Sequence, residues 1–151
     1  MKKTISDEEL NERIRLNFHR ISDSAYYQMP AVFSPIGYDW PGDTEGRVIL
    51  SYVSHYKISG EKIASMEPMI EAFPSKVNER GYLGAVYTDV LFEQQLSGHS
   101  WVLRGLCEYY EQFGKEAVLR MIDRIVENLY MPTKGRFSTY PTDRTKKDGG
   151  G

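Results

Sequence analysis

The sequence predicts an all-α fold, an incomplete α/α toroid built from helical hairpin repeats of about 54 residues. The first observation is that residues 43–60 align with residues 97–114, which places Val48 on Val102, Tyr56 on Tyr110 and Gly60 on Gly114. The second is a set of five apolar stripes at helical spacing, and the third is the single glycine that separates two stripes in each unit. A unit of this size buries its apolar face by stacking on its copies.

Length and charge favour one ordinary globular domain. The chain has 151 residues, 40% of them apolar, which suits one toroid segment over residues 1–143 and a flexible tail over 144–151. The net charge is −2 with both signs mixed, and the one basic run, 144–147, lies in that tail. We therefore expect no nucleic-acid partner, because such proteins carry a concentrated basic patch.

Cysteine content and hydropathy exclude several other classes. Cys107 is the single cysteine, so the chain forms no internal disulfide and no cysteine-based metal cluster, and we expect a buried packing thiol there. No segment approaches the roughly 20 apolar residues of a membrane span. No signal peptide follows Met1, which predicts a cytoplasmic protein if Met1 is the native start. We expect no cofactor, no metal and no membrane partner.

The first helix is predicted over residues 6–21. Ser6 and Glu9 have the spacing of a capping box, and an apolar stripe follows at Leu10, Ile14, Phe18 and Ile21. Residues 22–43 then form a long irregular segment rich in proline, glycine and aromatic residues. Loops of this length in compact domains are usually functional, and the aromatic content argues against disorder.

Two helical hairpins are predicted to follow. The second helix covers residues 44–59, with Asp43 as its N-cap, and the third covers 61–73. Pro68 fits the third helix if that helix starts late at Ser65.

The second hairpin follows another long connection. Residues 74–96 are expected to hold short strands at 81–88, and the fourth helix covers 98–113 with Ser97 as its cap. The fifth helix covers 115–130, and residues 136–151 read as irregular.

The candidate site lies where the long loops enter the second and fourth helices. The opposite ends are closed by one-residue turns, and binding residues concentrate on long loops held by a rigid scaffold. Glu45 and His99 are equivalent in the repeat, so we expect them on one rim. The inventory of indoles, amides, carboxylates and an imidazole is typical of a sugar site. The predicted substrate-binding residues are Trp40, Asp43, Glu45, Arg47, Gln94, Gln95, His99 and Trp101.

Plainer interpretations stand beside this one. Asp43 and Ser97 also suit ordinary helix caps, Arg47 suits an ion pair with a neighbouring acid, and a lone His99 suits a structural role. Glu45 and Glu93 are the candidate carboxylate pair for glycoside hydrolysis, but the helix dipole also favours acids in a first turn.

Three segments resemble the β-L-arabinofuranosidase-like glycoside hydrolases: Trp40–Arg47 (WPGDTEGR), Gly81–Gly84 (GYLG) and Glu93–Tyr110 (EQQLSGHSWVLRGLCEYY). The resemblance covers roughly residues 25–142 and implies the N-terminal part of an (α/α)6 toroid. In characterised members the catalytic groups are a zinc-bound cysteine and glutamates, and the resemblance implies that these lie beyond Gly151. Cys107 matches none of them. Family members often carry a Gly-His pair at the start of this helix, with a tyrosine nine positions after the histidine. Here Tyr110 follows His99 by eleven, so Trp101 falls nearer the family's histidine position.

Three functions therefore remain open from the sequence. The first is part of a glycoside hydrolase domain that contributes sugar contacts, with the catalytic residues unknown. The second is a non-catalytic helical-repeat binding or scaffold module. The third, a toroid lyase, requires a basic cluster for uronates, and only Arg47 lies near the predicted site. Two hairpins cannot close a toroid, so we also expect self-association through open helical edges. The substrate sugar, its linkage and the oligomeric state are not specified by these patterns.

Overall fold

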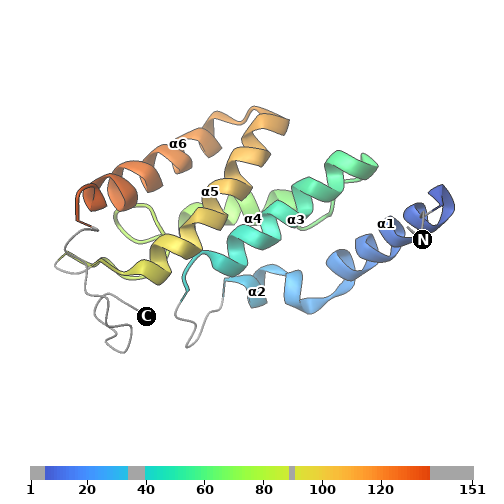
Figure 1. Cartoon of the computed structure of the whole chain (residues 1–151), viewed down its shortest axis with the longest axis horizontal. Coiled ribbons are helices and arrows are strands. Elements are labelled where there is room, and N and C mark those ends of the chain that lie inside the picture. The colour runs from blue at the N-terminus through green and yellow to red at the C-terminus, as the bar shows by residue number, and fades with distance from the viewer. Residues whose placement is uncertain (1–5, 34–39, 89–90, 137–151) are drawn as a thin grey trace, which may run out of the picture.

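A computed structural model describes residues 6–33, 40–88 and 91–136, and within these ranges the chain forms helices and no β-strand. Two antiparallel helical hairpins make up the body, and a leading helix precedes them (Figure 1). The prediction of an all-α fold is confirmed. The tail predicted over 144–151 lies outside the described residues.

The leading helix α1 spans Asp7–Asp23. Ser6 is its N-cap, and the Ser6 hydroxyl accepts a hydrogen bond from the Glu9 amide at 3.1 Å, as the sequence predicts. Of the predicted apolar stripe only Ile21 is fully buried, and Leu10 is 50% exposed. The loop that follows is less irregular than expected, because it contains a 3-10 turn at Ala25–Tyr27 and the short helix α2 at Met29–Val32.

The first hairpin joins α3, Asp43–Ser59, to α4, Met66–Ala72. The N-cap of α3 is Gly42, not Asp43, and Gly60 ends the helix in the left-handed conformation with φ of 75°. Helix α4 starts late, directly after Ser65, which places Pro68 in the first turn. Proline is tolerated there because the first amides of a helix have no intrahelical acceptor.

The second hairpin joins α5, Glu93–Phe113, to α6, Glu116–Ile125. Gly114 ends α5 in the left-handed conformation with φ of 63°, and a π-helical turn at Val126–Tyr130 extends α6. Helix α5 begins five residues before the predicted start, so Ser97 is not its cap. We attribute the error to Gly98, which marks a close helix contact in this chain and not a helix end.

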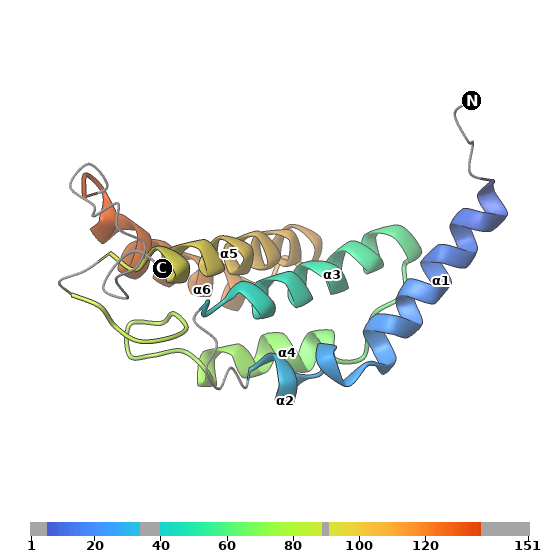
Figure 2. The same cartoon turned by 60° about the horizontal axis from the view of Figure 1, so that its bottom comes forward.

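Helices α3 and α5 lie side by side and run parallel, while α4 packs beneath α3 and α6 packs against α5 (Figure 2). The core lies between these layers and is unusually aromatic. Its largest fully buried side chains include Tyr52, Tyr82, Tyr109 and Phe73, together with Met66 and Met69. Tyr52 of α3 and Tyr109 of α5 therefore pack in the contacts between helices.

Glu67 ties α4 to the second hairpin. Its carboxylate accepts hydrogen bonds from the Tyr109 hydroxyl at 2.6 Å and from the Lys62 ammonium at 3.1 Å, and it also pairs with Lys115. Partial burial raises the pKa of Glu67, but these donors outweigh that effect and lower the pKa to about 2.

Two further expectations are wrong. The segment 81–88 forms bends, because its backbone groups bond to side chains of α5 and of Asn78, and the part of the chain that the structure describes contains no strand to pair with it. Cys107 is exposed, because it lies on the side of α5 turned away from the core. Partial desolvation and the charges of Glu111 and Glu108 raise the pKa of its thiol.

Candidate functional site

The site is built where α3 and α5 begin, and glycines allow the two helices to approach closely there. A Cβ atom on Gly46 would lie 2.2 Å from the backbone of Trp101 and Val102. A Cβ atom on Gly98 would lie 2.3 Å from the carbonyl oxygen of Pro41. Both distances are far below any real contact, so the close approach requires glycine at these positions. The contact presses the turn that precedes α3 against the second turn of α5.

Glu45 lies beneath this turn and does not face solvent. Its side chain is 2% exposed, and Oε2 accepts a hydrogen bond from the amide of Gly42 at 3.1 Å. Burial raises the pKa of Glu45, although bonds from the amides of Glu45 and Gly42 act in the opposite direction. The carboxylate therefore serves α3 as a cap, which is the plainer of the two interpretations of this residue.

His99 is fully buried, and both of its ring nitrogens have partners within the chain. Nε2 accepts a hydrogen bond from the amide of Leu83 at 2.9 Å, so Nδ1 carries the proton and donates it to the carbonyl of Gln95 at 2.7 Å. Burial lowers the pKa of His99 to about 4, against the opposing effect of the Gln95 carbonyl. The imidazole is thus a neutral connector between α5 and the 81–85 loop.

Gln95 holds the same loop from one turn earlier in α5. Its Nε2 donates to the carbonyls of Leu83 at 2.8 Å and Ala85 at 2.9 Å, and the side chain is 2% exposed. On the far side of the loop, Asn78 donates to the carbonyl of Gly84 at 2.9 Å. Side chains from both flanks therefore hold a loop that has no strand to pair with.

Asp43, Arg47 and Trp101 form the outer surface of the rim. The Arg47 Nε donates to Asp43 Oδ1 at 2.9 Å, and the guanidinium carbon lies 4.1 Å from the centroid of the Trp101 ring. The ion pair expected for Arg47 is present, and a cation–π contact adds to it. Arg104 approaches the same indole at 5.8 Å.

The predicted residues thus occupy two layers of one rim. Pro41 connects the two layers. A Cβ atom added to Gly84 would lie 2.7 Å from the ring of Pro41, and the carbonyl group of Pro41 lies against Gly98. Glu45, Gln95 and His99 are buried in the inner layer. Trp40 (39% exposed), Asp43, Arg47, Gln94 and Trp101 reach the surface to different degrees.

The cavity that Gln95 borders is too small for a sugar. It encloses about 40 Å³ and is also lined by Tyr82, Tyr87, Asn128 and Arg136. Sites for small molecules usually enclose about 300 Å³ or more. A saccharide would therefore have to lie on the open rim. Within the described residues no group of three or more His, Cys, Asp or Glu side chains is placed to hold a metal ion. No described helix is long and apolar enough to cross a bilayer.

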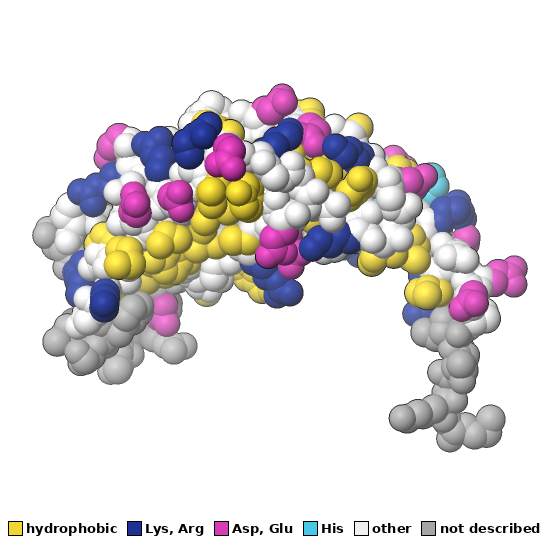
Figure 3. Space-filling model, turned by 90° about the horizontal axis from the view of Figure 1, so that it is seen from above, with side chains coloured by type: hydrophobic (Ala, Val, Ile, Leu, Met, Phe, Trp, Pro, Cys, Tyr) yellow, Lys and Arg dark blue, Asp and Glu magenta, His cyan; other side chains and the backbone are white. Residues whose placement is uncertain are grey.

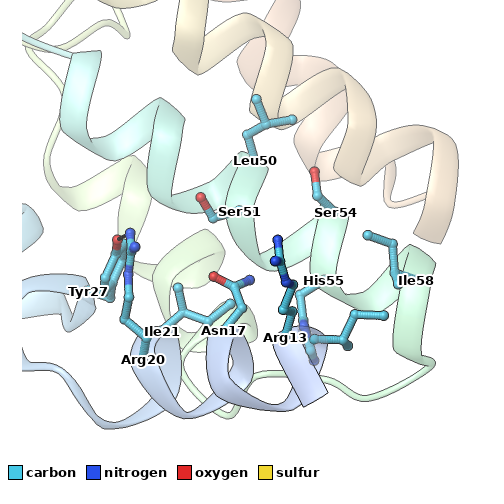
Figure 4. A pocket seen from close by; sticks show the side chains of 11 residues that line it. Arg13, Asn17, Arg20, Ile21, Tyr27, Leu50, Ser51, Ser54, His55 and Ile58 are labelled. Atoms are coloured by element: carbon cyan, nitrogen blue, oxygen red, sulfur yellow. Dashed lines mark hydrogen bonds between the residues drawn. The ribbon is translucent and has the colours of Figure 1, made fainter. Parts of the chain in front are cut away.

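A larger hollow, which the sequence analysis did not anticipate, lies between α1 and α3 (Figure 4). Its volume is about 410 Å³, and Arg13, Asn17 and Arg20 line it from α1. Their spacing of four and three residues places them on one helical face, which is the sequence signal that could have revealed this groove.

Comparison with protein-family models, curated proteins and solved structures finds no match to this chain.

Proposed function

We propose that this chain forms the first two hairpins of an α/α toroid of glycoside hydrolase type and contributes sugar contacts to it. The observation that carries the proposal is the rigid rim at the start of α3 and α5, which presents exposed aromatic rings. Trp40 is 39% exposed and Tyr87 is 40% exposed, on two loops that meet at Pro41 and Gly84. Exposed flat rings on a fixed platform suit stacking against the apolar faces of sugars.

The residues divide by role in this proposal. Trp40, Asp43, Arg47, Gln94 and Trp101 contact the saccharide, while Glu45, Gln95 and His99 shape the platform beneath them. Arg47 has a fixed orientation between Asp43 and Trp101, so its remaining N–H groups are available to sugar hydroxyls. The resemblance to the arabinofuranosidase-like hydrolases supports a saccharide that contains L-arabinofuranose.

In this proposal the rim binds the saccharide, and Glu45 and His99 do not act as its acid–base pair. Glu45 is occupied by the Gly42 amide, and His99 stays neutral at pH 7 because its pKa lies near 4. We therefore expect this chain alone to bind sugar without hydrolysing it.

The first prediction tests this role by titrating the full chain with arabinofuranose-containing oligosaccharides and following amide shifts by NMR. We expect Trp40→Ala to weaken binding about tenfold, which corresponds to about 1.4 kcal/mol of lost stacking. Tyr26→Ala is the matched control, because Tyr26 is also an exposed ring, at 60%, but belongs to the turn after α1. Equal loss in both variants, or turnover of an aryl arabinofuranoside by the isolated chain, would overturn the proposal.

The second candidate is a non-catalytic binding module, and one observation favours it. Aliphatic side chains line the groove between α1 and α3, where Ile58 is 67% exposed and Ile14 and Leu50 are half-buried. Aliphatic surface is suited to protein and not to sugar, since sugars stack on aromatic rings.

A further inference from the structure

The groove between α1 and α3 combines an apolar floor with a cationic wall. Ile14 and Ile21 of α1 and Leu50 and Ile58 of α3 provide aliphatic surface, and Ile21 is 2% exposed at the base. His55, 4% exposed, closes the base and packs against Phe18 with ring centroids 5.0 Å apart. Buried side chains of both helices therefore close the base of the groove.

Two arginines give the groove a charge opposite in sign to that of the whole chain. Arg13 and Arg20 lie two turns apart on α1, about 10 Å along the helix axis, with Asn17 between them. None of the described residues that line the groove is Asp or Glu, although Glu9 pairs with Arg13 at 2.7 Å from one turn earlier in α1. The whole chain, in contrast, carries a net charge of −2. Arg20 also donates to the Tyr27 hydroxyl, which fixes its guanidinium at one end of the groove.

Helix α1 is weakly supported on this side. It has 17 residues, yet Ile21 is its one fully buried residue among those described. In Figure 2, α1 diverges from the helical body toward its N-terminus. An isolated helix of this length is marginal in water, so a third helix laid between α1 and α3 would bury apolar surface that both leave open.

We propose that this groove binds an acidic amphipathic α-helix of a partner protein. Its apolar stripe would cover Ile14, Leu50 and Ile58, and two carboxylates seven residues apart would reach Arg13 and Arg20. The aliphatic floor selects a peptide over an acidic oligosaccharide, because sugars would leave that surface uncovered. Arg13 is paired with Glu9 at 2.7 Å in the free protein, and on binding its guanidinium would leave Glu9 or contact both carboxylates. Loss of this ion pair would cost little free energy, because exposed ion pairs contribute little to stability in water. This inference is independent of the sugar site.

The second prediction is tested with a designed probe. The probe is a fluorescein-labelled peptide of about four helical turns, with leucines along one face and two glutamates seven residues apart beside them. Fluorescence anisotropy with the full chain should show saturable binding that weakens with salt. The same peptide with glutamine for both glutamates should bind several-fold more weakly.

Matched variants locate the binding site. Arg13→Gln should raise the Kd about three- to fivefold. Arg15→Gln should leave the Kd unchanged, because Arg15 pairs with Glu12 on the other side of α1. Ile58→Asp should raise the Kd more than tenfold by placing a charge among the aliphatic side chains of the groove, and Ile58→Ser repeats the test without the charge. Thermal melts confirm that each variant folds.

Four results would overturn the proposal. One is the absence of saturable binding by the acidic peptide, and another is equal binding of the glutamine peptide. A third is competition by oligogalacturonate at lower concentration than the peptide, which would make the groove a sugar site. The fourth is self-association that Ile58→Asp abolishes, which would make a second copy of this chain the occupant.

Discussion

At the scale of single residues, His99 shows that a residue type common in active sites can have a structural role instead. It lies near the start of α5, and two hydrogen bonds and complete burial commit its side chain to packing against the 81–85 loop. Burial disfavours the imidazolium, which is why the pKa is lowered from 6.5 to about 4. The same burial predicts a pH dependence of stability.

The third prediction concerns that dependence. Between pH 6.5 and 4 the unfolded chain protonates His99 and the folded chain does not, so stability falls as the pH falls through this window. The total loss is about 2–3 kcal/mol, measured as the free energy of unfolding in urea. Glu45 has a raised pKa and acts in the opposite direction, so the comparison must be made with a variant.

His99→Gln isolates the contribution of the imidazole. It removes the titrating group and should flatten the pH profile between 6.5 and 4, while costing about 1–3 kcal/mol at pH 7 through unpaired backbone groups. A profile with the same slope in wild type and variant would show that His99 does not control it.

At the scale of elements, the contact between α3 and α5 decides the geometry of the rim. Gly46 and Gly98 bring the helix backbones together, and Gly105 continues the contact, since its Cβ would lie 2.8 Å from the Gly46 carbonyl. Such closeness leaves no room for a methyl group, because the obstructing atoms belong to backbone and cannot rotate away.

The fourth prediction follows from this contact. Gly46→Ala should destabilise the protein by more than about 2 kcal/mol by forcing the helices apart, even though alanine favours helix. Ser54→Ala, on the exposed side of the same helix, should leave the melting temperature unchanged within a few degrees. Equal melting temperatures for the two variants would contradict the close packing.

At the scale of the whole molecule, the second hairpin leaves apolar surface open. Leu103 and Tyr110 of α5 and Ile122 of α6 are only partly buried. Figure 3 shows apolar side chains gathered in a band over the end of the molecule where α6 lies. Exposed apolar bands of this kind promote association between copies of a chain.

The fifth prediction is that the chain self-associates through this edge. Light scattering at rising concentration should show a growing mean mass, and Ile122→Glu should abolish the growth by placing a charge in the band. Ile58→Asp should not change it, because Ile58 belongs to the groove on the other side of α3. A mass that stays monomeric at every concentration would refute the open edge.

Much of the helical framework followed from the sequence by itself. Three helix ends depend on local chemistry alone. Ser6 caps the start of α1 with its side chain, and Gly60 and Gly114 end α3 and α5 in the left-handed conformation. Neighbouring residues therefore suffice to predict these ends. The sequence also predicts Glu45 at the start of one helix and His99 near the start of another, and these two helix starts lie against each other in the structure.

Only the tertiary structure decided the roles of these residues. The distance between α3 and α5 decides whether Glu45 and His99 face a ligand or the core. Gly46 and Gly98 determine this distance, and they lie 52 positions apart in the sequence. The groove beside α1 likewise depends on the angle at which α1 leaves the helical body, which long-range packing determines. Local patterns specify which elements form, while burial, and with it the chemistry available to each side chain, arises only when those elements meet.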